Sequence, residues 1–131
     1  MRLRGIRRLA ESMCDNWEEG RNGHSRMFEV LVPDAFALRG TSKSGGTYRE
    51  HVVPCAAVRD GCMEMFKAGR TVDDVVAMID KYLHIVLISK DEAHHRDNVL
   101  KLKTTMPDGW VFGEGDPLAR LTLAKIELAA E

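Results

Sequence analysis

The sequence has few aromatic residues, no excess of either charge and no long hydrophobic run, and each shortage excludes a class of protein. Aromatic residues make up only 6% of the 131 residues, so the seven methionines are expected to fill part of any core. The 19 Lys and Arg against 20 Asp and Glu give a net charge of -1, which excludes a uniformly basic nucleic-acid coat. No stretch approaches the roughly 18 apolar residues that a transmembrane helix needs.

Cysteine is also scarce. The three cysteines, Cys14, Cys55 and Cys62, contain no CxxC pair, which argues against a disulfide framework and against a four-cysteine zinc site. The first residues are basic but lack the apolar stretch of a signal peptide. We therefore expect a cytoplasmic protein with no membrane contact.

The remaining composition is that of a folded protein, with 44% hydrophobic and 30% charged residues. The length fits one domain, which we place over residues 1–131. Apolar spacing and capping residues predict helices over residues 3–17, 55–68, 72–82 and 90–103. Runs of β-branched and apolar residues predict strands over 26–32, 48–53 and 83–88, and residues 39–47 are expected to form a surface loop. The pattern leaves open whether residues 118–128 form a helix or a strand.

These elements predict an α+β fold. We expect a short, largely antiparallel sheet of three or four strands, covered by about four helices.

Two segments carry the candidate chemistry. In the first, Glu50 and His51 stand at the end of a predicted strand, just before Pro54. A carboxylate can bind a metal ion, and a neutral imidazole can deprotonate a water nucleophile. The two side chains point to opposite faces of an ideal strand, so a bend near Pro54 would be needed to bring them together.

The second segment is the predicted helix that begins at Ser89 and contains His94 and His95. A helical projection places His95 at the edge of the buried side and His94 toward solvent. His95 is therefore the better candidate for a metal ligand. The alternative is that His95 is a structural residue at the edge of the core.

The pair Glu50-His51 with Pro54, followed by a strand and a helix with His94 and His95, resembles the HNH, or His-Me finger, nucleases over residues 48–100. The resemblance implies metal-dependent hydrolysis of phosphodiester bonds. It assigns His51 as the general base and Glu50 and His95 as ligands of a divalent metal, for which Mg, Mn, Zn and Ni remain open. The helices predicted between residues 55 and 82 depart from the compact motif of this family and would have to be an insertion between its paired strands.

If the protein acts on DNA, Arg39, Lys43 and Arg49 should form a positive surface beside His51 and contact phosphates. An RNA substrate would require the same groups. The competing hypothesis is a non-catalytic phage or mobile-element accessory protein that binds a protein partner or DNA. In that case Glu50, His51 and His95 are structural. The distances between these three side chains distinguish the two hypotheses.

Overall fold

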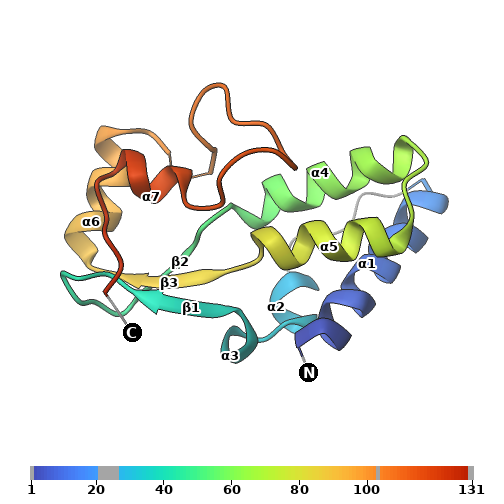
Figure 1. Ribbon diagram of the computed structural model, residues 1–131, viewed down its shortest axis with the longest axis horizontal. Helices are drawn as coiled ribbons and strands as arrows, with labels where there is room; N and C mark the ends of the chain where they lie inside the picture. Colours follow the sequence, from blue (N-terminus) through green and yellow to red (C-terminus); the bar gives the residue numbers. More distant parts are fainter. Residues whose placement is uncertain (1, 21–26, 103, 130–131) are drawn as a thin grey trace.

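The computed structural model describes residues 2–20, 27–102 and 104–129 (Figure 1). Its elements follow one another as α1 (Arg2–Glu18), α2 (Met27–Leu31), α3 (Asp34–Ala37), β1 (Leu38–Thr41), β2 (Tyr48–His51), α4 (Cys55–Lys67), α5 (Val72–Tyr82), β3 (Ile85–Ile88), α6 (Lys90–His94), the π-helix η1 (His95–Val99) and α7 (Ala119–Leu123).

The three strands form one small sheet in the order β1-β3-β2. β3 is the central strand, and its burial explains its nearly continuous apolar sequence. It pairs antiparallel with β2, where Glu50 lies opposite Val86 and His51 opposite Ile85. It pairs parallel with β1. The α+β class is confirmed, but the sheet is mixed rather than largely antiparallel.

Helices α4 and α5 connect the two antiparallel strands and lie side by side with α1 next to them (Figure 1). Thr71 forms a capping box with Asp74 at the start of α5, as the sequence predicted for a helix beginning there. Ser89 and Glu92 form a second capping box at the start of α6. Helices α1, α4 and α5 pack against one another, and α6 contacts β2. The core includes Ile6, Leu9, Met13, Val58, Cys62, Val75, Ile79, Tyr82, Val86 and Ile88.

Three predicted elements differ in the structure. Met27–Leu31 is a helix rather than a strand, and the rest of the expected strand at position 26 lies outside the described residues. Phe28 and Val32 are both buried. Their separation of four residues is helical, and a short apolar run does not distinguish the two structures by its pattern alone.

The expected loop over residues 39–47 begins with strand β1. Its pairing with β3 depends on backbone groups and therefore needs no apolar side chain. The helix expected over 90–103 ends earlier, because α6 widens into η1 and Lys101 adopts a φ of 59°. Val99, an apolar residue at the end of η1, is 60% exposed.

No helix in the described part of the chain is both long enough and apolar enough to span a bilayer.

Candidate functional site

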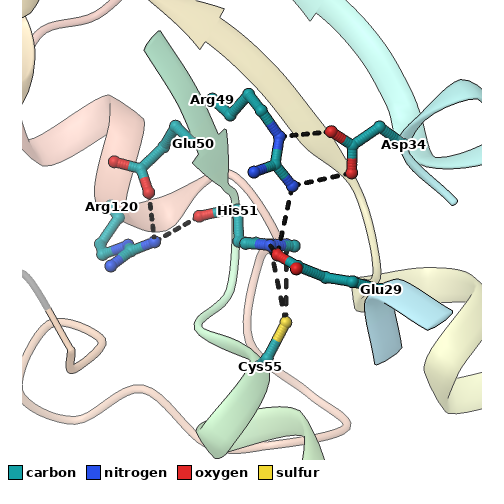
Figure 2. Close-up of polar contacts among 7 residues, drawn as sticks. All are labelled: Glu29, Asp34, Arg49, Glu50, His51, Cys55 and Arg120. Atoms are coloured by element: carbon teal, nitrogen blue, oxygen red, sulfur yellow. Dashed lines mark hydrogen bonds and ion pairs between the residues drawn. The ribbon is translucent and has the colours of Figure 1, made fainter. Parts of the chain in front are cut away.

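The candidate site lies on β2, whose side chains alternate between two different environments (Figure 2). Glu50 points to one side of the strand, toward Arg120 of α7. His51 points to the other side, toward Glu29 of α2 and Cys55 of α4. The two adjacent residues therefore take part in separate clusters, as the geometry of an ideal strand requires.

The first cluster is a buried ion-pair network around Glu50. The exposed fractions are 5% for Glu50, 2% for Arg96 and 1% for Arg120. Glu50 Oε1 accepts a hydrogen bond of 3.1 Å from Arg120 Nη2, and Glu50 Oε2 pairs with Arg96. Arg96 also pairs with Asp97, so the network holds two positive and two negative side chains.

Arg120 also anchors backbone groups. Its guanidinium donates to the carbonyl oxygen of His51 and, over 2.8 Å, to that of Leu102. Burial, together with the nearby charge of Arg96, lowers the pKa of Arg120 to about 10, so its guanidinium still carries its charge at pH 7. One side chain thus connects α7, the end of β2 and the chain that follows η1.

The second cluster surrounds His51. The imidazole is half-buried, with Nε2 3.9 Å from a Glu29 carboxylate oxygen and both ring nitrogens 3.6 Å from Cys55 Sγ. Arg49 lies on the same side of β2 and donates to Asp34 over 2.7 Å and to Glu29 over 3.2 Å. The positive charge of the Arg49 guanidinium is therefore already paired with the carboxylates of Asp34 and Glu29.

Burial lowers the pKa of His51, and the charge of Arg49 adds to the effect, so the imidazole is neutral at pH 7. Burial raises the pKa of the neighbouring Cys55 thiol to about 11, and the Glu29 carboxylate acts in the same direction. His51 could accept a proton, whereas Cys55 is held as an unreactive thiol.

His95, the predicted metal ligand on the helix, is exposed at the start of η1. Arg96, the next residue, turns toward β2 and pairs with Glu50. His94 is exposed, as expected, and its Nδ1 lies 3.1 Å from Asn98 Nδ2. The helix therefore presents a cation, rather than an imidazole, to the carboxylate of Glu50.

The three basic residues predicted to contact phosphates do not gather beside His51. Arg39 lies on β1, at the opposite edge of the sheet from β2. Lys43 follows β1 and pairs with Glu127 over 2.9 Å. Arg49 alone adjoins His51, with its guanidinium bound to carboxylates. The predicted positive surface is not formed.

These positions bear on the prediction that Glu50 and His95 bind a metal ion beside His51 as the general base. Glu50 and His51 lie on opposite sides of β2, and the carboxylate of Glu50 is bound by two guanidinium groups. The predicted ligand set does not fit a metal in this arrangement, and we derive no chemical step through one.

The two arginines that bind Glu50 were not singled out in the sequence. Arg96 could have been found, because it lies three residues after Ala93 and four before Leu100, which is the spacing of residues on one face of a helix. The positive charge of the Arg96 side chain, however, favoured an exposed position, because arginine is rarely buried without a partner. Arg120 lies 70 positions from Glu50 and carries no local signal that connects the two.

Comparison of the chain with protein families, curated proteins and solved structures found no match.

Proposed function

We propose that this chain is a non-catalytic binding module that recognises another protein. The observation that carries the proposal is the state of Glu50. The carboxylate that a metal-dependent hydrolase would need is buried and bound by Arg96 and Arg120. A buried carboxylate with two guanidinium partners has a structural role that needs no substrate.

A protein partner is favoured over DNA by the charges around the site. DNA binding depends on Lys and Arg side chains that pair with phosphates and release the counterions bound to DNA. Lys43 and Arg49 already pair with Glu127, Glu29 and Asp34, so phosphate binding would have to break these ion pairs. The chain as a whole has a net charge of -1.

The proposal is tested with the full chain in two assays. Supercoiled plasmid and single-stranded RNA are incubated with the protein and Mg, Mn, Ni or Zn, and we expect both substrates to stay intact. Affinity capture from source cells should then yield a protein that forms a defined complex when both components are purified separately. Cleavage that disappears in His51→Ala, measured on variants that remain folded, would overturn the proposal.

A metal-dependent nuclease is the second candidate, and the order of elements favours it. β2 and β3 are antiparallel neighbours, α4 and α5 form the insertion between them, and α6 follows β3 and contacts β2. The antiparallel strand pair followed by a helix is the arrangement that the resemblance to HNH nucleases implies, and α4 and α5 are an addition to it. The cleavage assay described above distinguishes the two candidates directly.

A further inference from the structure

A groove lies along the loop before α7, away from the residues of β2. It consists of two adjoining hollows of about 360 and 510 Å³, which share Pro107 and Ala119 in their walls. Trp110 lines the first hollow, and Leu123 of α7 lines the second. Together the two hollows could hold a short segment of extended chain with several side chains.

The walls of the first hollow are held by specific contacts. Trp110 Nε1 donates to the carbonyl oxygen of Asp116 over 2.9 Å. Gly115 packs directly against the indole, since a Cβ atom there would lie 2.2 Å from Nε1. Tyr82 Oη accepts from the Gly113 amide and donates to the Gly115 carbonyl, each over 2.9 Å. These contacts fix the walls of the first hollow before any ligand arrives, which lowers the entropic cost of binding there.

The surface of the groove combines apolar side chains with negative charge. Val111 is 53% exposed and Leu123 is 51% exposed, although both are large apolar residues. Val111 lines the first hollow and Leu123 the second, so each hollow has an exposed apolar side chain in its wall. The charged residues of the lining are Asp108, Glu114, Asp116 and Lys125, three carboxylates against one ammonium.

We propose that this groove binds a segment of a partner protein that carries both aliphatic and arginine side chains. This inference rests on the proposed function and specifies the chemistry of the partner. Aliphatic side chains would cover Leu123 and Ala119, while arginine would face Asp108 and Glu114 at the rim. The net negative charge of the lining favours such a segment over an acidic one.

The test uses synthetic peptides and the indole NMR signals of the ¹⁵N-labelled full chain. The sequence has two tryptophans, so Trp110 reports on the groove, and Trp17 on α1 serves as an internal control. We expect acetyl-Leu-Arg-Leu-Arg-amide to shift the Trp110 signal saturably and to leave the Trp17 signal in place. The acidic peptide acetyl-Leu-Glu-Leu-Glu-amide should cause no shift, and acetyl-Ser-Arg-Ser-Arg-amide should bind more weakly.

Three variants identify the residues responsible. Asp108→Asn and Glu114→Gln should each raise the dissociation constant of the basic peptide about two- to fivefold, which is the range for exposed ion pairs. Leu123→Ser should raise this dissociation constant by a larger factor, because it removes an apolar contact. Glu11→Gln removes an exposed carboxylate on α1 and is the matched control, with no expected effect.

Three results would overturn the inference. One is an unmoved Trp110 signal with the basic peptide, and another is an equal shift with the acidic peptide. The third is a dimer of the free chain in sedimentation that Leu123→Ser dissociates, because a second copy would then occupy the groove. Failure of the peptide test alongside a reconstituted protein complex would refute this groove without refuting the proposed function.

Discussion

Replacing Glu50 with glutamine tests the central structural observation, because it removes one charge and almost no volume. In the folded protein, Arg96 and Arg120 would then remain buried, at 2% and 1% exposure, with Asp97 as the remaining carboxylate of the network. Removing one partner of a buried ion pair costs about 3–5 kcal/mol, because it leaves a buried charge uncompensated. A domain of this size is stable by only about 5–15 kcal/mol, so the loss is a large fraction of the total.

The assay is thermal and denaturant unfolding at pH 7 by circular dichroism. The loss corresponds to a fall in Tm of roughly 10–18 °C for a domain of this length. Glu127→Gln is the matched control, since Glu127 pairs with Lys43 at the surface and both side chains are mostly exposed. That variant should leave Tm nearly unchanged, because solvent screens the pair.

A combined variant separates an uncompensated charge from a simple packing defect. Glu50→Leu, Arg96→Met and Arg120→Met together remove every charge of the central pairs. This variant should be more stable than Glu50→Gln, because a well-packed apolar replacement avoids the desolvation cost. A Glu50→Gln protein that melts within about 2 °C of wild type would refute the reasoning.

Three further predictions follow from individual side chains. The pKa of His51 is lowered in the folded state, so the unfolded state binds its proton more readily. The stability contributed by neutral His51 is thus present above about pH 6.5 and is lost as the pH falls through the folded pKa. Urea unfolding between pH 5 and 8 should show a shallower decline in the free energy of unfolding for His51→Gln than for wild type, and an equal decline would contradict the prediction. Tyr82→Phe removes a hydroxyl that bridges two loop backbone groups and should cost about 1–3 kcal/mol in the same assay; an unchanged stability would contradict the bridge. Native Cys55, with its pKa raised to about 11, is about one part in a thousand thiolate at pH 8. Mass spectrometry after iodoacetamide treatment should therefore find Cys14 alkylated before Cys55, and the reverse order would contradict the burial of Cys55.

The sequence by itself determined the elements whose signals are local. Thr71 and Ser89 start helices because a side-chain oxygen and an acidic residue three positions later satisfy free backbone amides. The apolar run around β3 marks a central strand because both faces of that strand are covered. The opposite directions of Glu50 and His51 also follow from strand geometry alone.

Only the tertiary structure decided what those side chains do. The partners of Glu50 come from η1 and from α7, and Arg120 lies 70 residues further along the chain. Met27–Leu31 became a helix because Phe28 and Val32 both reach the core, which a short apolar run cannot reveal. Pairing over such distances depends on the packing of whole elements, since a local sequence pattern records only neighbours along the chain. The same carboxylate that the sequence offers to a metal is thereby placed between two arginines.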